Sequence, residues 1–286
     1  MALPTYARGW RLTRRPAYRR SALKAARFLA SRFDRDVGAT RSWGARDRRF
    51  TVIVDNLMNI ELLFWGVRHG GPRAWRRMAR RHALTTLRDH VRPDGSTYHV
   101  VDYDADTGAV LQKRTVQGAS RESTWSRGQA WAIRGFAAAY RQTADARLLQ
   151  GARRTAGWWL RHLPRDEVPF WDFDAPRLVR GSAALAMSSA GLARPPRDSS
   201  AAAIAASGLL DLARLEPSPR RARRFRRAAV ATLGSLSSRR YLARGARGRS
   251  ILLHGTGDHE RGTADRGLIF GDYYFLEALA RARLDL

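Results

Sequence analysis

The stretch Ser126–Leu163, SRGQAWAIRGFAAAYRQTADARLLQGARRTAGWWLRHL, contains two helical patterns separated by a short polar turn. Its first half, up to Tyr140, is rich in alanine and larger apolar residues, which predicts a helix buried on most sides. A turn at Ala144-Asp145 leads into a second, more basic helix that extends to about His162. The stretch therefore predicts a helical hairpin with a buried inner helix and a solvated outer helix.

The same order of apolar helix, polar turn and arginine-rich helix recurs along the chain. It is found in the four stretches Tyr6–Phe33, Leu62–Val91, Phe136–Leu163 and Leu209–Leu236. Such repeats predict hairpins that pack side by side and bury a continuous core. With a last helix at Tyr273–Arg283, about nine helices are expected, the first of them poorly formed. The pattern predicts an all-α fold in concentric layers, and the odd number indicates a ring of hairpins that starts within a hairpin.

Composition limits the classes of function. The chain has 286 residues, no cysteine and a net charge of +28. The absence of cysteine excludes a disulfide framework, a thiolate metal site and a cysteine nucleophile. Arginine supplies 51 of the 53 basic residues. This favours a general compositional bias over a surface built for an anionic partner, and arginines spread over every outer helix argue against a nucleic-acid-binding protein. No apolar run is long enough for a membrane span.

Three long loops separate the hairpins, at Arg92–Glu122, Pro164–Arg197 and Ser237–Gly271. Loops of this length are usually functional or disordered. In the first loop, Val101–Gly108 predicts a small β-hairpin with an Asp-rich turn. In the second, the low-complexity segment Leu178–Pro196 predicts a flexible insertion. We expect residues 1–286 to form one domain around these loops.

Asp55 precedes the very apolar segment that begins at Leu57. One interpretation is structural, because an aspartate at this position can cap the helix by accepting backbone N–H bonds. The other is functional. A partly buried carboxylic acid beside Leu57 and Met58 has a raised pKa, holds a proton near neutral pH and can act as a general acid.

Two tryptophans and an arginine, Trp125, Arg127 and Trp131, lie within one helix start. The guanidinium could hold a carboxylate and the indoles could stack on a sugar ring, although a buried aromatic pair with a structural arginine is the alternative. His99 begins the predicted β-hairpin and Gln117 follows it, but a single histidine in a loop is more often a surface residue than a catalytic one. The sequence contains no metal-ligand spacing, no phosphate-binding loop, no dinucleotide fingerprint and no nucleophile elbow, so no metal and no cofactor are expected.

At these residues the sequence resembles the unsaturated glucuronyl hydrolases, glycoside hydrolase family 88. The matching strings occur in the family's order and cover almost the whole chain. They are VDNLMNIELLFW (Val54–Trp65), STWSRGQAW (Ser123–Trp131), PFWDFDAP (Pro169–Pro176), RDSSAAAIAASGLLDLARL (Arg197–Leu215) and HGTG with FGDYYFLEAL (His254–Leu279). The resemblance implies an (α/α)6 toroid, in agreement with the concentric hairpins expected above.

The resemblance also implies a reaction. The substrate is a lyase-generated oligosaccharide that ends in a 4,5-unsaturated uronic acid, and the enzyme hydrates the enol-ether double bond so that the product collapses and releases the sugar. By similarity, Asp55 is the general acid/base. The positions that resemble substrate-binding residues are Trp43, His99, Gln117, Trp125, Arg127 and Trp131, with Arg127 as the clamp for the uronate carboxylate.

Two departures from the family pattern qualify this expectation. The family's earlier His-Asp-x-Gly-Phe motif, with a second functional carboxylate, is absent, and about three of twelve helices are missing with it. Arg121 and Glu122 stand where the family more often has two aspartates. The alternatives are a non-catalytic remnant of this family and the related unsaturated rhamnogalacturonyl hydrolase activity. By similarity we expect a cytoplasmic protein without a membrane or specific nucleic-acid partner, and with inner helices exposed at the gap.

Overall fold

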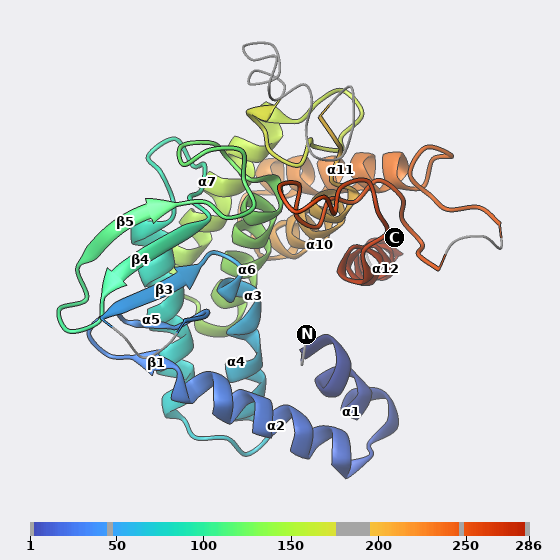
Figure 1. Ribbon diagram of the computed structural model, residues 1–286. Coiled ribbons are helices and arrows are strands. Elements are labelled where there is room, and N and C mark those ends of the chain that lie inside the picture. The colour runs from blue at the N-terminus through green and yellow to red at the C-terminus, as the bar shows by residue number, and fades with distance from the viewer. Residues whose placement is uncertain (1–2, 45–47, 176–194, 246–248, 284–286) are drawn as a thin grey trace.

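The computed structural model describes residues 3–44, 48–175, 195–245 and 249–283 (Figure 1). It is mostly helical, with two small sheets. The helices are η1 (Leu3–Ala7, a π-helix), α1 (Arg8–Thr13), α2 (Pro16–Ser31), α3 (Asn56–Asn59), α4 (Glu61–Arg68), α5 (Ala74–Asp89), α6 (Ser126–Thr143), α7 (Ala146–His162), α10 (Ser199–Leu215), α11 (Pro219–Leu236) and α12 (Ile269–Arg283). The strands are β1 (Phe33–Asp34), β2 (Ala39–Thr40), β3 (Arg49–Ile53), β4 (Val100–Asp104) and β5 (Val110–Arg114).

The hairpin α6–α7 forms where the sequence predicts it. Ala144 ends α6 in the left-handed conformation, with φ 56°, and Asp145 caps α7 by accepting a hydrogen bond from the backbone N–H of Arg147. The hairpin α10–α11 is built in the same way around Pro219, whose fixed φ suits the first turn of α11. Two of the predicted hairpins are thereby confirmed, with turns set by local chemistry.

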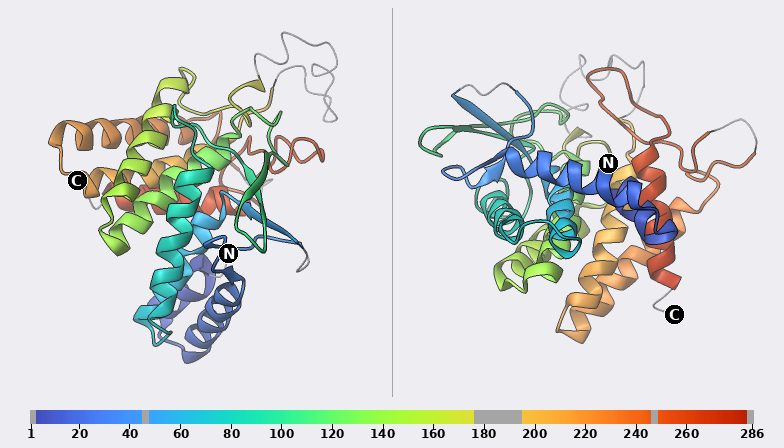
Figure 2. Two further views of the ribbon diagram at one scale, coloured as in Figure 1. Left: turned by 90° about the vertical axis from the view of Figure 1, so that its left-hand side faces the viewer. Right: turned by 90° about the horizontal axis from the view of Figure 1, so that it is seen from below.

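Inner and outer helices differ in burial as the composition predicts. Every residue from Ser126 to Ala139 of α6 and from Ser199 to Leu212 of α10 is buried. These two helices pack against each other, and each also contacts its outer partner, α7 or α11 (Figures 1 and 2). α12 packs against α10 but leaves Leu276 and Leu279 exposed. α12 therefore presents apolar side chains to solvent.

The N-terminal part differs from the predicted hairpins in detail. The stretch Tyr6–Phe33 does contain a helix that Pro16 opens, but the first member is divided into the short helices η1 and α1. The apolar helix expected from Leu57 is interrupted at Ile60, so that α3 and α4 are separate. The predicted hairpin within Leu62–Val91 is present as α4 and α5, which pack together.

A three-stranded antiparallel sheet, β3-β4-β5, lies beside the helices (Figure 1). The predicted hairpin at Val101–Gly108 is confirmed as β4 and β5, whereas β3 had not been predicted. In the register of β3 and β4, Ile53 pairs with Val100, and the backbone N–H of Val54 donates to the carbonyl of His99 at 3.0 Å. This pairing brings Asp55, just after β3, next to His99, just before β4.

Residues 178–194 of the predicted insertion Leu178–Pro196 lie outside the described residues. Within the described ranges, no helix has the length and apolar character needed to cross a membrane.

Candidate functional site

Asp55 lies at the junction between β3 and the short helix α3. Its side chain accepts no capping hydrogen bond from α3, although its backbone stands in the N-cap position, so the structural interpretation of this residue is not supported. The side chain is 19% exposed. Burial raises the pKa of the Asp55 carboxyl to about 6, while Arg127 and Trp131 act in the opposite direction by favouring the carboxylate. Near neutral pH the group therefore exchanges a proton readily.

His99 faces Asp55 across the end of the sheet, with 3.8 Å between Nε2 of the imidazole and Oδ2 of the carboxyl. Burial, followed by the charge of Arg127, lowers the pKa of His99 to about 3, so the ring is neutral. Its Nδ1 accepts hydrogen bonds from the backbone N–H groups of Val116 and Gln117, at 3.3 and 3.4 Å. A neutral imidazole that accepts at Nδ1 carries its proton on Nε2, the atom that faces Asp55.

Arg127, in the first turn of α6, is almost fully buried, with 3% exposure. Its Nη1 donates to Oδ2 of Asp198 at 2.7 Å and to the carbonyl of Thr256, and Nη2 donates to the carbonyl of Gly257 at 2.5 Å. The guanidinium also lies 4.5 Å from the ring centroid of Trp125. These contacts hold the cation in one orientation, in a region from which water is largely excluded.

Aromatic rings connect these groups. Trp125 and His99 have ring centroids 4.3 Å apart, and Trp131 meets the ring of Tyr274 edge-on at 5.3 Å. The ring centroid of Phe270 lies 5.3 Å from the guanidinium carbon of Arg127. Both Phe270 and Tyr274 belong to α12, so residues from opposite ends of the chain come together in this region.

The remaining predicted site residues occupy two different places. Gln117 donates from its side-chain amide to the carbonyl of Gly257 at 2.7 Å, the same carbonyl that Arg127 binds. Trp43 is 40% exposed and lines a pocket together with Asn56, the neighbour of Asp55 in sequence. The structure thus clusters Asp55, His99, Trp125 and Arg127, with Gln117 at their edge and Trp43 on the adjoining surface.

Asp198 is a residue of this site that the sequence analysis did not single out. It is fully buried, pairs with Arg127, and caps α10 by accepting from the backbone N–H groups of Ser200 and Ala201 at 3.1 and 3.3 Å. The signal was present in the sequence, because an aspartate followed by two serines and an alanine-rich run is typical of a helix start. Its second partner, Arg127, lies 71 positions away and carries no such signal.

Asp172 positions the loop that carries Gln117. Its carboxylate is fully buried and accepts from the backbone N–H of Ala119 at 3.0 Å and from the hydroxyl of Ser123 at 2.7 Å. Burial raises the pKa of Asp172 despite these hydrogen bonds. These hydrogen bonds anchor the loop from which the side chain of Gln117 reaches the carbonyl of Gly257.

Within the described part of the chain, no group of three or more histidine or acidic side chains is arranged to hold a metal ion. The clustered groups are one proton-exchanging acid, one neutral imidazole and one fixed cation beside aromatic faces. This combination suits proton transfer to a ring-shaped, negatively charged molecule.

Comparison with known proteins shows a consistent set of relatives. No family model matches the chain. It is 38% identical over 270 residues to an unsaturated glucuronyl hydrolase of Formosa agariphila, covering 92% of this chain and 63% of the relative. It is 37% identical over 278 residues to an unsaturated glucuronyl hydrolase of a Bacillus species, covering 95% of this chain and 70% of the relative.

Solved structures agree with the sequence relatives. A crystal structure of an unsaturated glucuronyl hydrolase specific for heparin matches with a TM-score of 0.89 and 37% identity, over 100% of this chain and 73% of that chain. This chain spans 63% to 70% of the length of the curated relatives it matches. The matched structures are (α/α)6 toroids, and the helices described above form part of such a ring. The chain belongs to the unsaturated glucuronyl hydrolases of glycoside hydrolase family 88.

Proposed function

We propose that this chain is a glycoside hydrolase that releases a 4,5-unsaturated uronic acid from lyase-generated oligosaccharides. The single observation that supports this most is the environment of Asp55. Burial raises the pKa of its carboxyl to about 6, and it faces the Nε2 of a neutral His99 at 3.8 Å. A carboxylic acid poised in this way can both give and take a proton near neutral pH.

In the proposed reaction, protonated Asp55 delivers its proton to C4 of the enol ether. The carboxylate then takes a proton from the water that adds at C5. The resulting hemiketal at C5 opens to a ketone, and the bond from C1 to the neighbouring sugar then breaks. The residue that carried the double bond leaves as a saturated keto acid. The Nε2–H of His99 is placed to hold a substrate or water oxygen next to Asp55.

The other predicted residues have binding roles in this proposal. Arg127 supplies positive charge for the uronate carboxylate while it remains oriented by Asp198. Trp125 and Trp131 offer ring faces to the sugar, and Gln117 and Trp43 define the sides of the site. Charge-assisted contacts and aromatic stacking are the interactions that acidic sugars require.

The names of the relatives suggest the class of oligosaccharide. Three streptococcal relatives are unsaturated chondroitin disaccharide hydrolases, and one solved relative is specific for heparin. We infer a substrate from the same group of lyase products, unsaturated uronyl disaccharides, and a cytoplasmic location in which such products are consumed.

The experiment is a turnover assay with unsaturated chondroitin, hyaluronan and heparin disaccharides, followed by the near-ultraviolet absorbance of the double bond. Asp55→Asn should reduce the rate at least about 1,000-fold, because it removes the only proton donor assigned to C4. Asp106→Asn, in the exposed turn after β4, is the matched control and should keep the parent rate.

The pH dependence tests the same assignment. If protonated Asp55 is the acid, kcat should fall as the pH rises through about 6, the value to which burial raises the pKa of this carboxyl. A folded parent chain that leaves the absorbance unchanged on all three disaccharides would contradict the proposed activity and favour a non-catalytic member of the family.

A further inference from the structure

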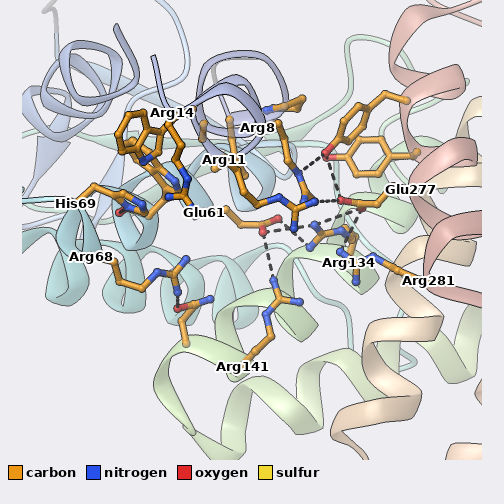
Figure 3. A pocket seen from close by; sticks show the side chains of 18 residues that line it. Arg8, Arg11, Arg14, Glu61, Arg68, His69, Arg134, Arg141, Glu277 and Arg281 are labelled. Carbon is orange, nitrogen blue, oxygen red and sulfur yellow. Dashed lines mark hydrogen bonds and ion pairs between the residues drawn. The ribbon is translucent and has the colours of Figure 1, made fainter. Parts of the chain in front are cut away.

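A polar cavity of about 310 Å³ lies between η1, α1, α4, α6 and α12 (Figure 3). None of the seven predicted site residues lines it. Its wall is dominated by guanidinium groups, since seven arginines line it against two glutamates, Glu61 and Glu277. The seven arginines are Arg8, Arg11, Arg14, Arg68, Arg134, Arg141 and Arg281.

Four of these arginines share a small number of carboxylates. Glu277 accepts from Arg8 at 2.6 Å and lies 3.6 Å from Arg134 and 3.3 Å from Arg281. Glu61 is 2.8 Å from Arg134 and 3.7 Å from Arg141. Behind the wall, a third carboxylate is shared in the same way. Asp211 pairs with Arg134, Arg141 and Arg281. Four cations thus meet three anions.

The other three arginines add to this excess. Arg68 donates to the side-chain oxygen of Gln142, a neutral group, and Arg14 lies over the ring of Trp10. Within the described residues, neither these two nor Arg11 forms an ion pair with a carboxylate. The cavity therefore carries about four more positive charges than negative ones when Asp211 is counted.

Three of the lining arginines, Arg68, Arg141 and Arg281, have a lowered pKa, whereas neighbouring acidic groups raise the pKa of Arg8 and Arg134. Burial lowers the pKa of Arg281 to about 9, with Arg134 and Arg141 contributing repulsion. Burial and then Arg141 lower the pKa of Arg68.

Arg134 is only 3% exposed, and its Nε makes no hydrogen bond. Its Nη1 forms the ion pair with Glu61 at 2.8 Å. Unused donors therefore remain in the wall. Most of its excess positive charge lies with Arg11, Arg14 and Arg68, which pair with no carboxylate among the described residues.

We propose that this cavity binds a small molecule with two or more oxyanion groups, such as phosphate, sulfate or carboxylate. Guanidinium groups bind these groups through paired, charge-assisted hydrogen bonds. The volume is at the lower end of the range for small-molecule pockets, which fits a compact polyanion better than an extended chain. Six of the arginines come from α1, α4, α6 and α12, and Arg14 directly follows α1, so several anionic groups are needed to engage them together (Figure 3).

The test is thermal unfolding of the whole chain with inorganic pyrophosphate, citrate or sodium sulfate, each at constant ionic strength set with sodium chloride. The site predicts a saturable rise in the unfolding midpoint of roughly 5 °C when the ligand is about 100-fold above its Kd. Pyrophosphate and citrate should act at lower concentrations than sulfate, because each bears several anionic groups, and their order identifies the preferred chemistry. Equal responses to the three anions and to chloride would overturn the proposal.

Variants separate the cavity from general attraction to a basic protein. Arg68→Gln and Arg11→Gln each remove a lining cation that holds no carboxylate, so they leave no buried acid unpaired. They should weaken pyrophosphate binding at least about tenfold. Arg223→Gln, on the exposed face of α11 away from the cavity, removes the same charge and should bind as the parent does.

The outcomes are distinct from those of the turnover assay. Equal loss of binding in Arg68→Gln and Arg223→Gln would show nonspecific charge attraction and refute the cavity as a site. Binding that depends on Arg68 and Arg11 would support it whether or not the chain hydrolyses disaccharides.

Discussion

Two buried arginines on α6, Arg127 and Arg134, have the same exposure of 3% but different surroundings. They lie seven positions apart and so project from nearly the same face of the helix. Arg127 has one carboxylate partner, Asp198, two backbone carbonyls and two aromatic faces. Arg134 lies among three carboxylates and three further arginines.

The comparison shows that neighbouring groups decide what a buried arginine can do. Around Arg127 one carboxylate and two backbone carbonyls accept hydrogen bonds from Nη1 and Nη2. The neighbouring acid, Asp55, is left to titrate near neutral pH. Around Arg134 the coulombic attraction of Glu61 and Glu277 outweighs the cost of burial and raises the pKa of the arginine further. The region around Arg127 is suited to proton transfer, and the region around Arg134 keeps its side chains ionised.

The largest effect is expected at Arg134, which lies within 3.6 Å of the carboxylates of Glu61, Asp211 and Glu277. Arg134→Met leaves Glu61, Asp211 and Glu277 with less compensation, and we expect a loss of about 3–5 kcal/mol in the free energy of unfolding, measured with urea. The control is Arg153→Met on α7, whose partner Glu216 keeps a second arginine, Arg221, at 3.0 Å. A loss in Arg134→Met no greater than in this control would show that the network contributes little.

A smaller effect, of opposite sign, is expected at Asp55. Because the folded pKa of its carboxyl is raised from 3.8 to about 6, the ionised form is disfavoured in the folded state, and stability falls as the pH rises between these values. Asp55→Asn should therefore stabilise the chain by about 3 kcal/mol above pH 6, and by nothing below pH 3.8, measured by urea denaturation at several pH values.

Asp145 gives the matched comparison for that measurement. Hydrogen bonds from Arg147 lower the pKa of Asp145 to about 2, so Asp145→Asn should destabilise the chain at neutral pH rather than stabilise it. If both substitutions changed stability in the same direction, the raised pKa assigned to Asp55 would be wrong.

The smallest effect is expected from Arg127→Lys. An ammonium group keeps the charge but cannot reproduce the fork that reaches Asp198 and Gly257 together. We expect KM for an unsaturated disaccharide to rise about tenfold, measured in the turnover assay. Arg153→Lys, at a comparable two-bonded pair with Glu216, should leave KM unchanged. An unchanged KM in Arg127→Lys would remove this residue from the proposed carboxylate clamp.

Much of the helical architecture could be predicted because its signals are local. The period of apolar residues predicts α6, α7, α10 and α11, and Pro219 marks the start of α11 within the local sequence. β3 was missed although Phe50–Ile53 consists of aromatic and β-branched residues, which are themselves a strand signal. Its pairing with β4 joins distant positions and is visible only in the folded chain. The interruption at Ile60 was missed because the apolar run continues through it.

For the candidate site, the residue types were readable but their partners were not. Asp55 and Arg127 stand out by their neighbours in sequence, and the resemblance places both in the same site. The pairing of Arg127 with Asp198, and the acceptance of two backbone N–H groups by His99, join positions far apart in the chain. Such pairs depend on how helices and loops pack, which no local pattern encodes.

The amino-acid sequence alone was enough to establish the layered helical hairpins, the absence of thiol chemistry and the resemblance to family 88. These depend on periodicity, composition and short motifs, each contained within a few turns of chain. The raised pKa of Asp55, the tautomer of His99 and the arginine-lined cavity became visible only in the folded chain. Burial and electrostatic interaction depend on distances between groups, and packing brings α1, α6 and α12 close enough for their charges to interact.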